Sequence, residues 1–217
     1  MILASILLLA AAQDAGEPLK DAGKPPIWSD DQRFADYGLG QEKPPVARAE
    51  MQRFGACVAD VSTERASRTL ASDFSTAAYR RSMDQLIDAN RGCAKGRGWA
   101  KMRSSRLLLA GAIAERLIER DPAPVNVRLA RAAALPAAAT YSPTDGGAMC
   151  VVRSAPDEVG KLFATEIGSA EEVAASVFLE GLFSRCMGGR PVEATPSALR
   201  AMLATAAFRS VNSRAEN

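Results

Sequence analysis

Two stretches of equal length decide the fold, CVADVSTERASRTLASDFSTAAYRRSMDQLIDANRGC at residues 57–93 and CVVRSAPDEVGKLFATEIGSAEEVAASVFLEGLFSRC at residues 150–186. Each stretch begins and ends with a cysteine, and the chain has 4 cysteines in its 217 residues. Equal spacing in both pairs indicates an internal repeat. A shift of 93 residues also places Cys57-Val58 on Cys150-Val151, and further apolar positions follow with one gap.

Apolar residues at helical spacing predict three helices in each repeat. In the second repeat the helix starts are Pro156, the capping box from Ser169 to Glu172, and Thr195-Pro196. The first repeat follows this pattern more loosely, with the expected N-caps Ser62, Ser75 and either Ser104 or Ser105. One more helix is expected to precede the first repeat and to carry Cys57. The corresponding residues 142–147, SPTDGG, predict a turn.

These patterns predict an all-α fold of two tandem three-helix repeats, each with one disulfide. We expect the repeats to pack as one pseudo-twofold domain, because a unit of this size has a small core. The alternative is an α+β fold in which short strands, such as 99–102 and 192–194, pair between the repeats. Residues 125–134 fit a short helix or a strand. The expected organisation is a signal peptide at 1–12, a flexible N-terminal arm at 13–45, repeat 1 at 46–121, a connector at 122–145 and repeat 2 at 146–217.

The first residues resemble an export signal. Residues 1–12 read MILASILLLAAA, an apolar run that ends in small residues. Such a run is too short to span a bilayer but has the length of a signal-peptide core. No Lys or Arg precedes it, which departs from the usual signal. The sequence therefore predicts a periplasmic or secreted protein with no transmembrane span.

In an exported chain, paired cysteines favour disulfides. The repeat predicts the pairs Cys57–Cys93 and Cys150–Cys186, because a duplicated unit should carry its own cross-link. A metal site or a redox pair is the weaker interpretation, since the chain has no C-x-x-C motif.

The composition excludes several classes of enzyme. The chain has no histidine, so no catalytic triad or Cys-His pair can form. No nucleophile elbow, P-loop or dinucleotide-binding glycine motif occurs. The formal net charge is only +2, so total charge alone predicts no polyanionic partner. No cofactor or metal is predicted, and the question of enzyme activity is left open with a preference for none.

A basic segment at 91–106 is the most suggestive local feature. It has six cations and no acid, with one tryptophan among them. Clustered cations around an aromatic ring are typical of sites for phosphate, nucleic acid or another anionic polymer. A solvated loop paired with acids elsewhere is the plainer interpretation. The candidate anion-binding residues are Arg91, Lys95, Arg97, Trp99, Lys101, Arg103 and Arg106.

Three functions are consistent with these features. The first, favoured by the missing catalytic motifs, is a non-catalytic binding or structural protein of the cell envelope, with another envelope protein as partner. The second is a binder of nucleic acid or an anionic polymer through the basic segment. The third is a hydrolase with two carboxylates in a deep cleft, at least one with a shifted pKa. The candidate acids are Asp60, Glu64, Glu115, Asp157, Glu158, Glu171, Glu172 and Glu180.

Overall fold

The computed structural model describes residues 42–94, 105–192 and 194–213. Every regular element within these residues is helical, which confirms the all-α prediction. The first of the two segments named as possible strands, 99–102, lies outside the described residues, and residues 192 and 194 of the second are not in a strand. The elements are α2 (Pro45–Val61), α3 (Thr63–Ala71), α4 (Ala77–Ala89), the 3-10 helix η1 (Arg91–Ala94), α5 (Arg106–Glu119), α6 (Val125–Ala133), α7 (Pro143–Ser154), α8 (Pro156–Phe163), α9 (Ala170–Cys186) and α10 (Pro196–Asn212).

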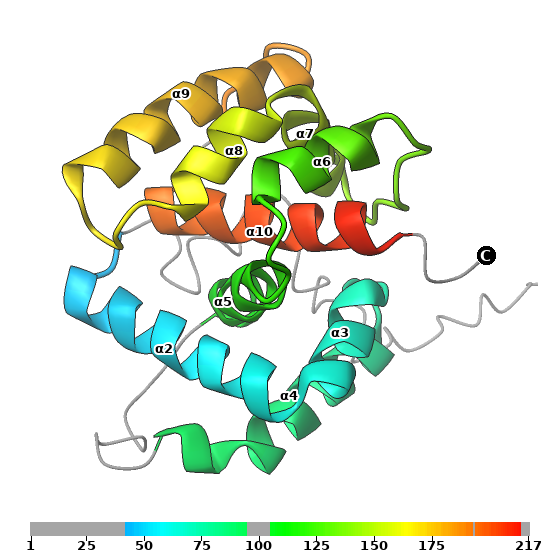
Figure 1. Ribbon diagram of the computed structural model, residues 1–217, viewed down its shortest axis with the longest axis vertical. Helices are drawn as coiled ribbons and strands as arrows, with labels where there is room; N and C mark the ends of the chain where they lie inside the picture. The colour runs from blue at the N-terminus through cyan, green and yellow to red at the C-terminus, as the bar shows by residue number, and fades with distance from the viewer. Residues whose placement is uncertain (1–41, 95–104, 193, 214–217) are drawn as a thin grey trace, which may run out of the picture.

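Helix α5 lies at the centre of the molecule and is seen end-on in Figure 1, between α2 and α10. Two glycines let these helices approach closely. A Cβ atom at Gly55 would lie 2.5 Å from the Cβ of Ala112, and a Cβ at Gly111 would lie 2.5 Å from the Cα of Ala201. The α2–α5 and α5–α10 contacts therefore need glycine at these two positions.

Replacing Gly111 by alanine should lower the free energy of unfolding by roughly 1–3 kcal/mol, because the added methyl group meets the backbone of α10. Urea denaturation followed by circular dichroism measures this change. Gly181→Ala is the matched control, since a Cβ at Gly181 meets no atom within 4 Å. We expect the control to stabilise the monomer by up to about 1 kcal/mol. Equal effects of the two substitutions would contradict this account of the close approach.

Side-chain caps start several helices where the sequence predicted them. Ser105, Ser169 and Thr195 each accept a hydrogen bond from the backbone N–H three residues later, at 3.2, 3.1 and 3.2 Å. Such a bond satisfies one of the free donors at a helix start. These contacts explain why α5, α9 and α10 begin at their positions.

Two predicted caps of the first repeat differ in the structure. The cap of α4 is Thr76, whose hydroxyl accepts from the N–H of Tyr79 at 3.1 Å. Ser75 instead donates its hydroxyl to Asp73. Ser62 precedes α3 but makes no side-chain cap, because its hydroxyl donates to Asn90 at 3.0 Å. Neighbouring acceptors therefore decide which of several serines and threonines becomes the cap.

A helix begins where the sequence predicted a turn, so the prediction for residues 142–147 is wrong. The Ser142 hydroxyl accepts from the N–H of Asp145 at 3.1 Å, and Pro143 occupies the first position of α7. Serine and proline serve a helix start as well as a turn, which is the physical reason for the error. The segment 125–134, which was left between helix and strand, forms α6.

Two disulfides are present, Cys57–Cys93 and Cys150–Cys186. Cys57 lies on α2 and Cys93 in η1, while Cys150 lies on α7 and Cys186 ends α9. The first bond therefore joins α2 to the 3-10 helix that follows α4, and the second joins α7 to the end of α9. That the halves arose as a repeat stays a prediction.

Apolar side chains from both halves form one buried cluster. Phe54, Met83 and Ile113 contribute from the first half, and Leu162 and Phe183 contribute from the second. In the described part of the chain, no helix has the length and apolar character needed to cross a bilayer. Residues 1–12, predicted as a signal peptide, and residues 13–41 of the predicted arm lie outside the described residues.

Candidate functional site

Two buried arginines and two buried glutamates meet between α2, α5, α9 and α10. Arg200 donates to the carboxylate of Glu115 at 2.5 and 3.0 Å and to Glu172 at 3.0 Å. Arg48 donates to the same Glu172 oxygen at 2.5 Å. All four side chains are less than a tenth exposed. We call these four residues the buried ion network.

Further hydrogen bonds complete this network. Arg200 also donates to the carbonyl oxygens of Phe163 and Thr165, and the N–H of Gly168 donates to Glu172 at 2.7 Å. Arg48 pairs with Glu42 at 2.9 Å. Each buried charge therefore has an opposite charge and further polar partners, as the cost of burying ions requires.

The pKa values of the two carboxyl groups are shifted in opposite directions. Burial raises the pKa of Glu115 above its usual value, although the hydrogen bond and charge of Arg200 lower it in part. Burial also acts to raise the pKa of Glu172, but hydrogen bonds from Arg48 and the Gly168 N–H outweigh it and hold the pKa below its usual value. The pKa of Arg200 is raised, because the two carboxylates outweigh burial, so Arg200 stays positively charged.

The cavity beside the buried ion network is small. Its volume is about 40 Å³, which admits a few water molecules at most. Arg48, Glu115 and Arg200 line it together with apolar residues. Two acids with shifted pKa values thus converge on one guanidinium, and the cavity that the described residues form beside them is too small for a substrate.

Two local features of the sequence point to this network in part. Ser169 caps α9 as expected, but the Glu172 carboxylate turns to Gly168, Arg48 and Arg200 instead of to the Ser169 N–H. Glu115 is the one acid in the run 107–118, which is apolar except for Glu115 and Arg116, and a buried acid there needs a partner. The neighbouring sequence does not identify that partner.

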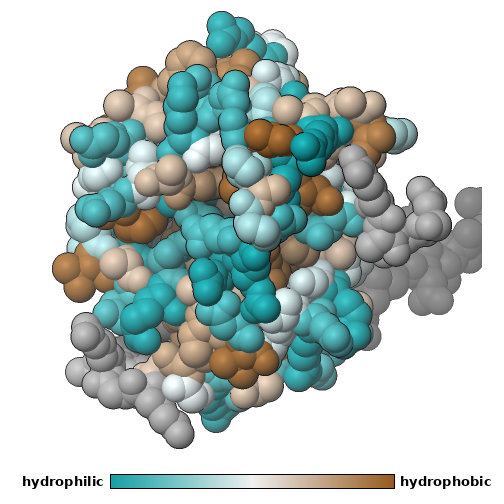
Figure 2. Space-filling view, viewed as in Figure 1, coloured by the Kyte–Doolittle hydropathy of each residue, from teal (hydrophilic) through white to brown (hydrophobic). Residues whose placement is uncertain are grey.

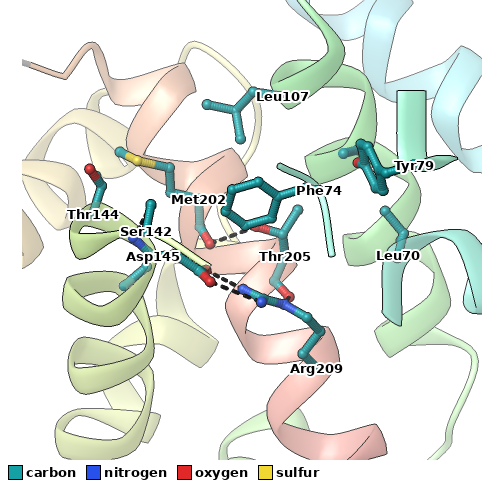
Figure 3. A pocket seen from close by; sticks show the side chains of 12 residues that line it. Leu70, Phe74, Tyr79, Leu107, Ser142, Thr144, Asp145, Met202, Thr205 and Arg209 are labelled. Atoms are coloured by element: carbon teal, nitrogen blue, oxygen red, sulfur yellow. Dashed lines mark hydrogen bonds and ion pairs between the residues drawn. The ribbon is translucent and has the colours of Figure 1, made fainter. Parts of the chain in front are cut away.

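A second buried ion pair joins α7 and α10. Arg209 makes a two-pronged contact with the Asp145 carboxylate and donates to the carbonyl oxygen of Ala139 at 3.2 Å (Figure 3). Its guanidinium carbon lies 5.7 Å from the ring centre of Phe74 and 5.4 Å from that of Tyr141. These cation–π distances add to the charge pairing. Arg209 therefore ties residues 139–145 to the last helix.

Replacing Asp145 by asparagine should lower the free energy of unfolding by roughly 3 kcal/mol, because Arg209 would keep a buried charge without its anion. Thermal and urea unfolding at neutral pH measure the loss. Asp84→Asn is the control, since Asp84 is half-exposed and pairs with Arg106 at the surface. The control should cost less than about 1 kcal/mol. If both variants lost the same free energy of unfolding, the buried Arg209–Asp145 pair would contribute no more than a surface ion pair.

An apolar pocket adjoins this pair. Figure 3 shows Leu70, Phe74, Leu107 and Met202 around it, with Arg209 below. Its volume is about 40 Å³, again only enough for a few waters. Burial raises the pKa of Tyr79 far above its usual value, so this phenol stays neutral. The pocket is therefore part of the buried core.

A larger groove opens on the other side of Arg209. Its volume is about 1010 Å³. Phe208 and Arg209 form a buried floor, and the rim combines small apolar residues with Ser67, Arg68 and Asn212. Arg68 is the one charged side chain of the rim among the described residues, and no acid lines the groove there. The lining comes from α3 (Ser67, Arg68, Ala71, Ser72), from residues 135–139 and Tyr141, and from α10 with Ser213.

One wall of this groove has open backbone groups. Residues 136–140 belong to no helix. Among the described residues, no acceptor is present for the amide N–H groups of Ala137, Ala138, Ala139 or Thr140. Backbone donors at a surface are satisfied by water and are available to a ligand. The groove therefore combines a floor of Phe208 and Arg209, one cation at its rim and, among the described residues, a backbone edge without partners.

The predicted anion-binding residues are mostly outside the described part of the chain. Lys95, Arg97, Trp99, Lys101 and Arg103 fall in the segment 95–104. The two described members each pair with an acid on α4, since Arg91 binds Asp88 at 2.6 Å and Arg106 binds Asp84 at 2.9 Å. These pairs agree with the plainer interpretation of a solvated basic segment, and polyanion binding stays untested.

Metal ligands do not gather in the described residues, where no group of three Cys, Asp or Glu side chains is placed to hold an ion. Comparison of the chain with known families, curated proteins and solved structures finds no match. The function is therefore inferred from the groove and its surroundings.

Proposed function

We propose that this chain is an exported, non-catalytic binding protein whose groove holds a peptide segment of another protein. The observation that carries the proposal is the groove of about 1010 Å³, whose wall at residues 137–139 has amide N–H groups with no acceptor among the described residues. This volume is typical of ligand sites, which are mostly apolar with a few placed polar groups.

A peptide fits this groove better than a small polar ligand does. The backbone groups of residues 137–140 can exchange hydrogen bonds with a peptide backbone, as in domains that bind a peptide along an open edge. Phe208 and Ala138 offer apolar contact for alternate side chains. Arg68 carries the rim's positive charge, so the preferred peptide has an acidic side chain or a terminal carboxylate nearby.

Non-catalytic binding is supported by the closed geometry of the acids. Glu115 and Glu172 are held by Arg200 beside a cavity of only about 40 Å³. A glycosidase-type pair of carboxylates needs room for substrate between its members.

Export is supported by the two disulfides and the apolar residues 1–12. Peptide mapping by mass spectrometry, under non-reducing conditions on protein from the cell envelope, tests it. We expect a mature N-terminus near Gln13 and both disulfides intact. An intact Met1 with four free thiols would reject export.

Selection of random linear peptides on phage, against the oxidised full chain, tests the groove. Peptides that bind the native protein should lose binding to Ala137→Trp, which fills the groove from its wall. Ala89→Trp, at an exposed alanine of α4, should leave binding unchanged. Selected peptides should also shift the amide resonances of residues 137–140. Failure to enrich any peptide, or equal binding to both variants, would reject this function.

A further inference from the structure

Helix α9 has an apolar outer face. Val173, Val177 and Phe178 are 48%, 64% and 53% exposed, and Ala174 and Gly181 are exposed on the same face. The opposite face of α9 enters the core through Leu179 and Phe183, among others. Helix α9 lies along the upper left rim in Figure 1, and Figure 2 shows apolar, tan and brown atoms along that rim. A surface helix that is apolar on both faces is unusual without a partner on its outer side.

A helix in the other half of the molecule has a polar outer face in a comparable position. Helix α4 also precedes the second cysteine of its disulfide and also turns one face to the core. Its outer face carries the exposed residues Arg81, Asp84, Gln85 and Asp88. Water therefore solvates the outer face of α4, whereas the outer face of α9 lacks charges at its centre.

No contact among the described residues explains Gly181. It lies inside the C-terminal part of α9, where glycine is less favourable to the helix than alanine. A Cβ at this position would meet nothing within 4 Å, in contrast to Gly55 and Gly111. A glycine on an exposed helix face permits the close approach of a second helix, and Ala174 extends the same small strip seven residues earlier.

Charges at the two ends of α9 select one arrangement. Glu171 lies in the first turn and Arg185 in the last turn, and both are exposed on the Phe178 side of the face. Within the described residues neither has an ion-pair partner. A parallel copy of α9 would place like charges together. An antiparallel copy is related by a twofold axis between Val177 and Phe178. In this arrangement Glu171 of each copy lies beside Arg185 of the other, so two ion pairs form.

We propose that the outer face of α9 pairs with the same face of a second copy of this chain, antiparallel about a twofold axis. Ala174 of one copy lies against Gly181 of the other, which lets the helices approach, and Phe178 packs at the centre. Such self-complementary pairing is the general form of a twofold interface. The acidic flanks, Glu171 and Glu180, disfavour the alternative of an anionic membrane surface.

The dimer is of the weak class. Helix α9 has 17 residues and is about 25 Å long, so its face alone gives an interface at the low end of specific contacts. Association therefore has to be measured at high protein concentration. The pairing is independent of the groove, which lies at α3, residues 135–141 and the end of α10.

Sedimentation velocity of the oxidised full chain, from about 5 µM to about 1 mM, tests the proposal. The wild type should shift from monomer to dimer over this range. Phe178→Glu should stay monomeric with an unchanged circular dichroism spectrum and thermal midpoint. Gly181→Ala should raise the thermal midpoint of the monomer and weaken the dimer at least several-fold. Gln85→Glu, on the outer face of α4, is the control and should dimerise as the wild type does.

A charge exchange separates this geometry from a general apolar association. Glu171→Arg and Arg185→Glu should each weaken the dimer, and the double variant should restore it, because the pairs form again with the signs reversed. A monomer throughout the concentration range, or a double variant weaker than both single variants, would overturn the proposal. Binding of the wild type, but not of Phe178→Glu, to phosphatidylethanolamine–phosphatidylglycerol vesicles without self-association would also overturn it and would assign the face to a membrane.

Discussion

Replacing Arg200 by methionine should lower the free energy of unfolding by roughly 4–5 kcal/mol near pH 8. Arg200 donates hydrogen bonds to the carboxylates of Glu115 and Glu172 and is the cation that pairs with Glu115. Removing one partner of a buried pair leaves an uncompensated buried charge, which costs about 3–5 kcal/mol. Glu172 keeps Arg48, so most of the loss comes from Glu115. Urea denaturation followed by circular dichroism measures the change.

The loss should become smaller as the pH falls from about 8 to about 5. The pKa of Glu115 is already raised by burial in the native protein, and removing Arg200 raises it further. A carboxyl whose pKa is higher in the folded state stabilises the fold at low pH and loses this contribution as the pH rises through the folded pKa. Protonated Glu115 needs no cation, so the variant recovers on acidification. Glu172, whose pKa is lowered, stays ionised over this window and does not oppose the recovery.

Arg81→Met is the control for loss of an arginine from a helix. Arg81 is exposed on α4 and has no ion-pair partner in the described residues, so the change should stay within about 0.5 kcal/mol. A loss below about 1 kcal/mol for Arg200→Met at pH 8, or a loss that grows on acidification, would show that the buried ion network does not carry this energy.

Removing either disulfide by a double cysteine-to-alanine substitution should cost about 4 kcal/mol. Both bonds close loops with the same sequence separation, 36 residues, and the chain-entropy model assigns each about this value. The loops do not overlap along the chain, so the two losses should add. Without both bonds the loss of about 8 kcal/mol equals the whole stability of a typical domain.

Guanidinium denaturation of the two double variants, and far-UV circular dichroism of the variant without cysteines, measure these effects. The Cys57/Cys93 variant should lose slightly more than the Cys150/Cys186 variant, because Cys93 is buried and its removal also leaves a gap. A cysteine-free chain that unfolds cooperatively with near-native stability would show that the helices alone hold the fold.

The sequence predicted the helical class and many helix starts because these depend on neighbours along the chain. Helical spacing of apolar residues and a serine or threonine before each run are local signals. Ser105, Ser169 and Thr195 cap helices where they were expected. The turn predicted at 142–147 failed for the same reason, since the local chemistry of a turn and a helix start is shared.

The buried charges and the groove could not be predicted, because they depend on contacts between distant segments. Glu115 and Arg200 are 85 positions apart, and Arg209 and Asp145 are 64 apart. Periodicity identifies which face of a helix is buried but not the helix that covers it. The groove needs α3, residues 135–139 and α10 together, and no single segment carries its pattern.

Helix α10 closes the molecule around α5, and this has a consequence for how the chain folds as it is made. The ribosome delivers residues 196–212 after every other helix described here. Until they arrive, the Gly111 side of α5 has no covering helix and Glu115 lacks its cation. The earlier helices therefore cannot reach their final packing on a growing chain, and a nascent chain held before residue 196 presents an open apolar surface. Packing around α5 is therefore complete only after α10 has been made.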